Sequence, residues 1–172
     1  MKTLEPKIYV ACLAAYNNGH LHGEWIDINK GIDHVWIRVK TMLANSPIPH
    51  SDEFVIHDYE DFVAIRIEEY TSLQTVCDIT VFLIEYGELG SEVLSHACGN
   101  LDEAREIIEN NYHGEFNSEE DFVYYWMSEV DGREIPEYLQ YYIDYKAMAH
   151  DFFITDFFSI DLDHKVHVFS CY

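Results

Sequence analysis

The stretch KIYVACLAAYNNGHLHGEWIDI, residues 7–28, decides how the chain begins to fold. Apolar side chains alternate with others from Lys7 to Ala14, which is the period of a β-strand. Asn17-Asn18-Gly19 is a turn signal, and Glu24 to Ile28 has the composition of a second strand. The sequence therefore predicts two strands joined by a turn.

A helix and a third strand are expected to follow this pair. Apolar residues recur at helical spacing from Ile32 to Leu43, which predicts a helix, and Asn45-Ser46-Pro47 is a typical helix-ending sequence. Phe54 to His57 is a short strand candidate that could close a small sheet.

Residues 70–110 have a helical pattern. Thr71 or Ser72 can cap a helix that runs to Gly87, because a hydroxyl in this position accepts a hydrogen bond from the first turn. Ser91 is expected to cap a short helix that ends at Gly99. A third helix is expected to begin at Asn100, with Glu103 completing a capping pair.

The remaining residues alternate between both kinds of element. We expect, in order, a strand at Tyr112–Phe116, a helix capped by Ser118, a helix opened by Ile135-Pro136, and a hairpin of Phe152–Ile160 and Val166–Phe169 around Asp161–His164. The predicted class is therefore α+β, organised as sheet plus helix, then helices, then helices with a terminal sheet.

The charge is strongly negative and unevenly distributed. Thirty-two Asp and Glu against ten Lys and Arg give a net charge of −22, of which residues 67–145 contribute −17. Proteins that bind DNA or RNA directly, or an anionic membrane surface, need the opposite sign. The chain is also 48% apolar and 15% aromatic, which excludes a disordered acidic tail. The composition indicates a folded protein with a basic partner.

Acidic residues recur on single faces of the expected helices. Glu85, Glu88 and Glu92 are three and four residues apart, and side chains at such offsets share a face. Like charges placed in this way repel each other by roughly 0.2–0.5 kcal/mol per pair. A solvated face that keeps the protein soluble is one explanation. The density of charge in residues 67–145 instead favours a surface that fits a cationic groove.

The histidines suggest a competing interpretation, a metal-dependent enzyme using His20, His22 and His57. His20 and His22 form an H-x-H pair, a spacing that two ligands on a strand can use. No H-E-x-x-H, C-x-x-C or calcium-loop motif occurs, so we expect no metal and no other cofactor. His57 and Asp58 are expected to share a local hydrogen bond.

Other catalytic patterns have no support in the sequence. There is no G-x-S-x-G elbow, and Gly87 and Gly90 form neither G-x-G-x-x-G nor a P-loop. Cys12 lies in an alternating strand, where a thiol usually fills core space. The aromatic residues between Tyr138 and Phe158 are expected to form core or a protein interface rather than a platform for stacking bases. The sequence predicts a binding protein and no catalytic residue.

The cysteine pattern indicates the cytoplasm. Four scattered cysteines form no C-x-x-C pair, and we expect reduced thiols. The apolar run Ile8–Ala15 weakly resembles a secretion signal, but Glu5 and Pro6 lie where such a signal is basic. No run approaches the ~20 apolar residues of a membrane span.

Four motifs that span almost the whole chain resemble the ArdA antirestriction family. They are Tyr16-Asn17-x-Gly19-x-x-x-Gly23-x-Trp25, His57-Asp58-Tyr59-Glu60, Tyr142-Ile143-Asp144-Tyr145-x-Ala147-x-Ala149-x-Asp151 and His167-Val168-Phe169. Residues 72–130 are similar to the family in acidity and length rather than residue by residue. The chain departs from the family pattern at Lys146, Met148 and His150.

The resemblance implies a DNA mimic that inhibits type I restriction-modification enzymes. It implies an elongated chain of three small domains, here 1–67, 68–110 and 111–172, with the acidic helices in the middle and the dimerisation domain at the end. Acidic side chains would imitate the phosphates of bent B-form DNA and occupy the DNA-binding groove of the methyltransferase core, blocking restriction and also modification. Such genes travel on mobile genetic elements and protect DNA during conjugative transfer. The family's antirestriction motif would fall near residues 129–142.

Two sets of residues are expected to carry this function. The phosphate-mimicking acids are Glu68, Glu69, Asp78, Glu85, Glu88, Glu92, Asp102, Glu103, Glu106, Glu109, Glu115, Glu119, Glu120, Asp121, Glu129, Asp131, Glu134 and Glu137. The homodimer interface is expected at Tyr145, Phe157, Phe158, Val166, Val168 and Phe169. The alternative to this function is an acidic adaptor that binds some other basic protein, with the metal-dependent enzyme as a third hypothesis.

Overall fold

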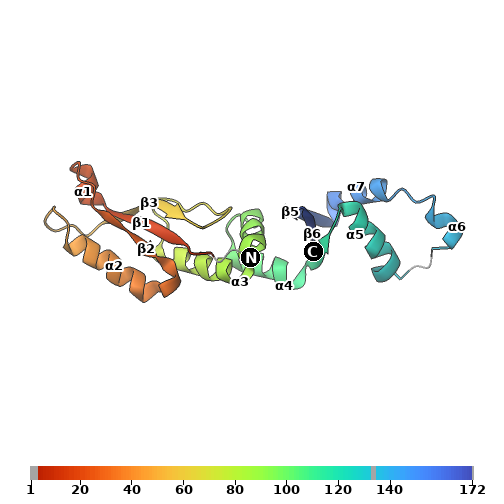
Figure 1. Cartoon of the computed structure of the whole chain (residues 1–172), viewed down its shortest axis with the longest axis horizontal. Helices are drawn as coiled ribbons and strands as arrows, with labels where there is room; N and C mark the ends of the chain where they lie inside the picture. Colours follow the sequence, from red (N-terminus) through yellow and green to blue (C-terminus); the bar gives the residue numbers. More distant parts are fainter. Residues whose placement is uncertain (1–3, 133–134, 172) are drawn as a thin grey trace. The chain divides into compact units, whose positions relative to one another are not determined.

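The computed structural model describes residues 4–132 and 135–171, and the chain divides into two compact units, Met1–Leu101 and Asp102–Tyr172. Each unit contains its own three-stranded antiparallel sheet together with helices (Figure 1). The class is α+β, as the sequence predicts. The division into three domains remains a prediction.

The first unit is built on a sheet with the strand order β2-β1-β3. The strands are β1 (Lys7–Cys12), β2 (Gly23–Asp27) and β3 (Phe54–Glu60), all within the predicted stretches or extending them by a few residues. Ile8 and Val10 on the central strand are fully buried, as its alternating pattern requires. The expected strand ends two residues early, because Leu13 and Ala14 begin a short helix, α1 (Leu13–Asn17), that Cys12 caps.

Two helices complete this unit after the 3₁₀ turn η1 (Ile28–Lys30). Helix α2 (Ile32–Ala44) packs against β1 and β2 through Val35, Val39 and Met42, and ends before Asn45 as predicted. Helix α3 (Leu73–His96) begins at the predicted cap, Ser72, whose Oγ accepts a hydrogen bond from the N–H of Thr75 at 3.1 Å.

The predicted end of a helix at Gly87 is confirmed, because α3 consists of two helices that meet at a kink there. Gly87 has φ 63° and ψ −146°, and helical backbone resumes after it and continues to His96. The prediction that Ser91 caps the following helix is wrong. Ser91 is fully buried inside that helix, and its Oγ accepts a hydrogen bond from the N–H of Ala64 at 2.8 Å. A cap needs a position before the first turn, and the first turn here already precedes Ser91.

The predicted elements of the second unit occur in the predicted order, but α7 (Tyr145–Thr155), a second helix before the terminal hairpin, is not among them. The elements of this unit are α4 (Leu101–Asn110), β4 (Tyr112–Phe116), α5 (Glu119–Tyr125), the π-helical turn η2 (Trp126–Val130), α6 (Glu137–Gln140), α7, β5 (Phe157–Leu162) and β6 (Lys165–Ser170). The sheet order is β4-β6-β5. Ser118 caps α5 as predicted, accepting a bond from the N–H of Asp121. Residues 152–155, expected in the hairpin, instead form the end of α7.

The core of the second unit is aromatic and lies between the sheet and two helices. Phe122 and Val123 from α5, Ala149 from α7, Phe157 from β5 and Val168 from β6 are buried together. The rings of Phe122 and Phe157 lie 4.8 Å apart at 68°, a favourable edge-to-face arrangement. This core fixes which aromatic residues remain available at the surface.

Candidate functional site

The structure places the predicted acids at the surface. Of the eighteen, Glu134 lies outside the described residues, and none of the other seventeen is buried. Glu92, Glu119 and Asp131 are partly exposed, and the remaining fourteen are exposed. Carboxylates in contact with water keep their charge without the cost of desolvation, so each unit presents exposed anionic groups from this set.

Helix α4 carries the densest group of these acids. Asp102, Glu103, Glu106 and Glu109 are exposed, whereas Ala104 and Ile107 are buried on the opposite face. Ten residues of α-helix span about 15 Å, so the helix presents one carboxylate per roughly 4 Å. One strand of B-form DNA carries one phosphate per ~3.4 Å. The spacing of carboxylates on this helix therefore approaches the spacing of phosphates on a DNA strand, and Arg105 on the same helix reduces its net charge to −3.

Some acids of the set also have structural roles. Glu119 Oε1 accepts a hydrogen bond from Ser159 Oγ at 2.7 Å, and Asp121 Oδ2 accepts one from Asn117 Nδ2 at 3.0 Å. Both lie in the first turn of α5, where negative charge interacts favourably with the helix dipole. Their loss would therefore affect stability as well as any partner.

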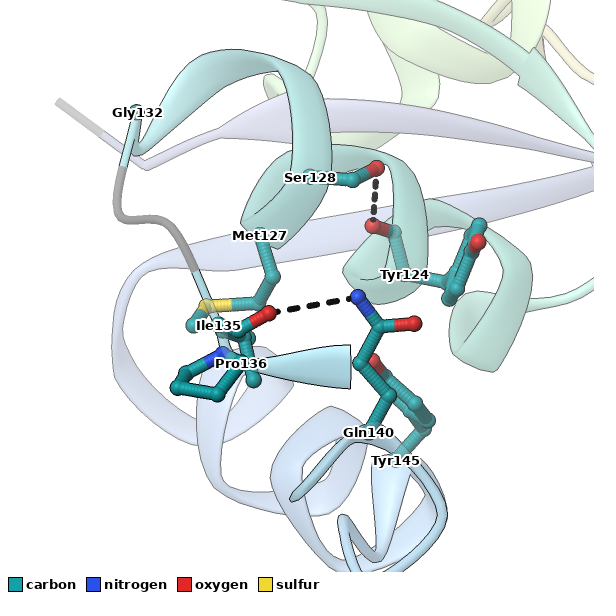
Figure 2. A pocket seen from close by; sticks show the side chains of 8 residues that line it. All are labelled: Tyr124, Met127, Ser128, Gly132, Ile135, Pro136, Gln140 and Tyr145. Carbon is teal, nitrogen blue, oxygen red and sulfur yellow. Dashed lines mark hydrogen bonds between the residues drawn. The ribbon is translucent and has the colours of Figure 1, made fainter. Parts of the chain in front are cut away.

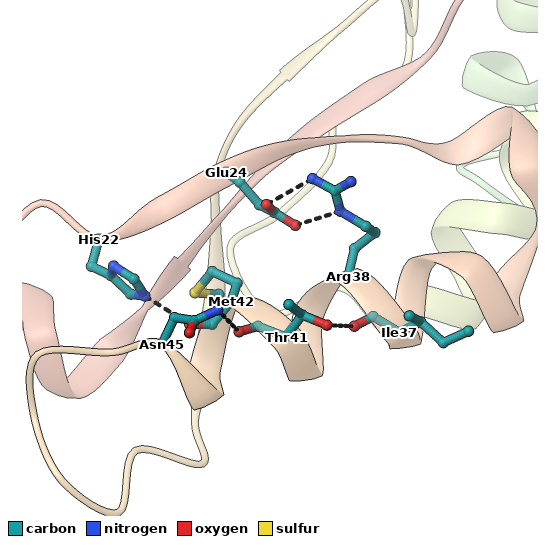
Figure 3. A network of polar contacts seen from close by, with 7 residues as sticks. All are labelled: His22, Glu24, Ile37, Arg38, Thr41, Met42 and Asn45. Carbon is teal, nitrogen blue, oxygen red and sulfur yellow. Dashed lines mark hydrogen bonds and ion pairs between the residues drawn. The ribbon is translucent and has the colours of Figure 1, made fainter.

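Ion pairs neutralise several acids at the N-terminal end of the chain. Arg38 Nε and Nη2 donate to the two carboxylate oxygens of Glu24, both at 2.9 Å, which connects α2 to β2 (Figure 3). Arg66 Nε lies 3.1 Å from Glu68 Oε1, so this candidate acid is also paired with an arginine. Pairing of this kind reduces the negative field of the first 68 residues.

The histidines do not assemble the proposed metal centre. His22 Nε2 donates to the carbonyl oxygen of Met42 at 2.7 Å (Figure 3), and the ring of His57 packs edge-on to Tyr16 at 4.6 Å. Asp58 Oδ1 accepts a hydrogen bond from the N–H of Tyr59 rather than from His57. Across residues 4–132 and 135–171, no three His, Cys, Asp or Glu side chains lie close enough to hold a metal ion.

The residues predicted for the dimer interface fall into two groups. Phe157, Val168 and Phe169 are at most 6% exposed within the single chain. Phe157 and Val168 belong to the core of the second unit, and the ring of Phe169 packs against Tyr112 and Phe158. Tyr145, Phe158 and Val166 remain partly exposed. The interface itself remains a prediction, and only the second group can take part in it without unfolding the unit.

Several apolar side chains in and just after α6 are exposed. Tyr138, Leu139, Tyr141 and Tyr142, here called the tyrosine patch, are 69%, 42%, 86% and 84% exposed. Sequence analysis expects the aromatic residues of this region to form core or a protein interface, and the three tyrosines are not core in the single chain. Helix α6 is only four residues long and has no buried residue, so it offers no buried face for these rings.

An open pocket of about 430 Å³ lies beside this patch (Figure 2). Tyr124, Met127, Pro136 and Tyr145 line it, and Gln140 Nε2 donates to the carbonyl oxygen of Ile135 at 3.3 Å. The lining combines aromatic and aliphatic side chains with the hydroxyl of Ser128 and the amide of Gln140, and includes no described carboxylate or histidine. Such a surface suits contact with another protein.

Together these features define the class of the protein: a small acidic α+β protein with many exposed carboxylates. No helix within the described residues is long and apolar enough to cross a membrane. The family model of the antirestriction protein ArdA matches residues 8–165. The chain therefore belongs to the ArdA antirestriction family. Comparison with curated proteins gives no match.

Proposed function

We propose that this protein inhibits type I restriction-modification enzymes by occupying their DNA-binding groove as a mimic of B-form DNA. The observation that carries the proposal is the exposure of the acids in residues 67–145, where the net charge is −17. Membership of the antirestriction family supplies the kind of target. The protein is then an inhibitor rather than an enzyme, acting in the cytoplasm on an enzyme and not on DNA itself.

The electrostatics of the surface support binding to a groove built for DNA. A groove that neutralises many phosphates carries many Lys and Arg side chains, and exposed carboxylates on α3, α4 and α5 provide matching charge. Each exposed ion pair contributes only about 0.2–1 kcal/mol, so affinity requires many pairs. The binding energy is therefore distributed, and no single acid is indispensable.

The active form is a homodimer that assembles through the second unit. The tyrosine patch and Val130 provide large exposed apolar groups there, and burial of such groups stabilises association by about 25 cal/mol per Å². Tyr145, Phe158 and Val166 are partly exposed and can extend the contact. A dimer would also double the length of charged surface that faces a long groove.

A competition titration tests the proposal. A fluorescent DNA duplex bound to a type I methyltransferase core is challenged with the full chain at two salt concentrations. We expect stoichiometric displacement of the duplex that weakens as salt rises, because exposed ion pairs are screened.

The same titration separates the proposal from its alternative. Absence of displacement at either salt concentration would reject groove binding and favour an acidic adaptor for another basic protein. Displacement without any dependence on salt would reject mimicry of the phosphate charges, even if restriction were still inhibited.

A further inference from the structure

Helix α3 turns a corner at the segment Gly87-Glu88-Leu89-Gly90, and glycine is required at both ends of it. Gly87 has φ 63° and ψ −146°, a region of backbone conformation that is essentially restricted to glycine. A Cβ at this position would meet no atom within 4 Å. The requirement at Gly87 is therefore one of backbone conformation alone.

Gly90 is required for a different reason. A Cβ on Gly90 would overlap Cβ of Tyr86 and lie 3.3 Å from Cε1 of Phe82. The absence of a side chain lets the second half of α3 approach the end of the first half. Figure 1 shows the two halves of α3 running in different directions from this point.

Contacts from a distant loop hold the corner in place. Ser91 is fully buried one residue beyond it and accepts a hydrogen bond from the N–H of Ala64 at 2.8 Å. Val93 and Leu94 in the second half are as fully buried as Phe82 and Leu83 in the first. Both halves are thus packed into the same unit, and the angle between them is not free to vary.

Candidate acids lie on both sides of this corner. Asp78 and Glu85 are exposed on the first half, and Glu88 is exposed and Glu92 partly exposed on the second. An α-helix without a break would carry all four along one straight axis. The corner instead directs the second pair away from the axis of the first.

We infer that the Gly87–Gly90 corner is a positioning element that sets the direction of the carboxylates of α3 toward a curved cationic surface. The inference rests on the proposed function, since it concerns the geometry of the same anionic surface. Gly87 itself touches no partner. It acts by letting Glu88 and Glu92 contact the partner at the same time as Asp78 and Glu85.

The test uses Gly87→Ala in the full chain, measured in the competition titration across a series of salt concentrations. An L-residue disfavours the backbone of Gly87 and favours a continuous helix. We expect displacement to weaken about tenfold, and the slope of log affinity against log salt to fall by about two as two carboxylates lose their contacts. A loss of folded protein would reduce the active fraction without changing this slope.

Two further variants control for backbone strain. Gly31→Ala is the matched control, because Gly31 has φ 83° and ψ 165°, a Cβ there meets nothing within 4 Å, and helix α2, which it caps, carries none of the candidate acids. It should lose similar stability and keep the salt slope. Replacement of Gly87 with D-alanine, for which this backbone is favourable, should restore both affinity and slope.

Gly90→Ala provides a second route to the same result, since its overlap with Tyr86 opens the corner without changing residue 87. A reduced slope in either folded variant supports the inference. Wild-type slope in both folded variants overturns it while leaving the proposed function standing. Failure of both variants to fold also overturns it, because the corner would then serve folding alone. Failure of the wild-type chain to displace DNA would reject the proposed function and the inference with it.

Discussion

His113 is the titratable side chain most closely surrounded by the aromatic core of the second unit. Its ring centroid lies 5.3 Å from that of Trp126 and 5.4 Å from that of Phe157, and its buried Nε2 has no hydrogen-bond partner among the described residues. Burial lowers the pKa of His113 below its ordinary value, because the charged ring would lose its hydration without gaining a partner.

This burial predicts a loss of stability in mild acid. An unfolded histidine takes up a proton near pH 6.5, whereas folded His113 does so only at lower pH. The unfolded state then binds more protons, and the free energy of unfolding falls as pH decreases below about 6.5. Urea unfolding between pH 7.5 and 5.5 should show this decline in the wild type and a smaller one in His113→Phe. His164→Gln removes an exposed histidine and is the control. If stability declines as steeply in His113→Phe as in His164→Gln, the decline does not come from His113 and the assignment is contradicted.

The hydroxyl of Ser91 binds the backbone of a distant loop instead of capping a helix, which is the role that the sequence suggests. Removing it leaves the N–H of Ala64 without its 2.8 Å acceptor. An unpaired donor in a partly buried site costs about 1–3 kcal/mol. We expect Ser91→Ala to lower the free energy of unfolding by that amount in urea titrations.

A cap variant provides the comparison for Ser91. Ser118→Ala removes the N-cap of α5, and loss of a cap typically costs about 1 kcal/mol. Stability of Ser91→Ala equal to that of the wild type would show that water replaces the hydroxyl at Ala64.

At the scale of elements, the sequence predicts local structure well where one face of an element is buried. The alternation of Lys7–Cys12 and the helical repeat of Ile32–Ala44 both appear in the structure within two residues of the expected bounds. The sequence predicts a strand at Phe152–Thr155, where aromatic and β-branched residues are frequent, yet this segment ends α7. Packing against Phe122 and Phe157 overrides that propensity.

The sequence also predicts only part of the candidate site. The acids of α4 are exposed because the opposite face of that helix is apolar, and this pattern is visible in the sequence. The prediction that Glu85 shares a face with Glu88 and Glu92 is wrong, because the break at Gly87 lies between them. The aromatic residues between Tyr138 and Phe158 give no such signal. Phe157 is core and Tyr141 is exposed. The difference depends on the end of α6 before Tyr141 and on the pairing of Phe157 with Ser170, which is distant in the sequence.

Helix α4 offers the clearest test of distributed binding. Neutralising Asp102, Glu103, Glu106 and Glu109 together should weaken displacement of DNA by about 1–4 kcal/mol, whereas each single change should cost about 0.2–1 kcal/mol. The measurement is the competition titration with the full chain, with helix content checked by circular dichroism.

The matched control for α4 removes the same number of charges elsewhere. Asp52, Glu53, Asp58 and Glu60 are exposed in the N-terminal region and lie outside the candidate surface. Their joint neutralisation should leave displacement close to that of the wild type. Equal losses in the two quadruple variants would indicate that net charge alone determines binding. Abolition of binding by one single change in α4 would reject the distributed description.

At the scale of the whole molecule, the proposed dimer must overcome repulsion between two chains that each carry a net charge of −22. Apolar contact through the tyrosine patch can supply the attraction, since association through such groups does not require opposite charge. Salt screens repulsion between exposed charges. The dimer should therefore become tighter as salt rises, while binding to the cationic target becomes weaker.

Sedimentation at about 50 mM and about 500 mM salt tests whether the dimer becomes tighter as salt rises and also locates its interface. Tyr141→Asp combined with Tyr142→Asp should give folded monomers at both concentrations, because both side chains are more than 80% exposed and their loss removes no core contact. Val168→Asp should instead unfold the second unit, since its side chain is fully buried and an unpaired charge there cannot be solvated.

A dimer that survives the tyrosine changes would move the interface to Tyr145, Phe158 and Val166. A wild-type dimer that dissociates as salt rises would show that ion pairs rather than apolar contacts join the two chains, and that part of the anionic surface is buried between them rather than available to the target.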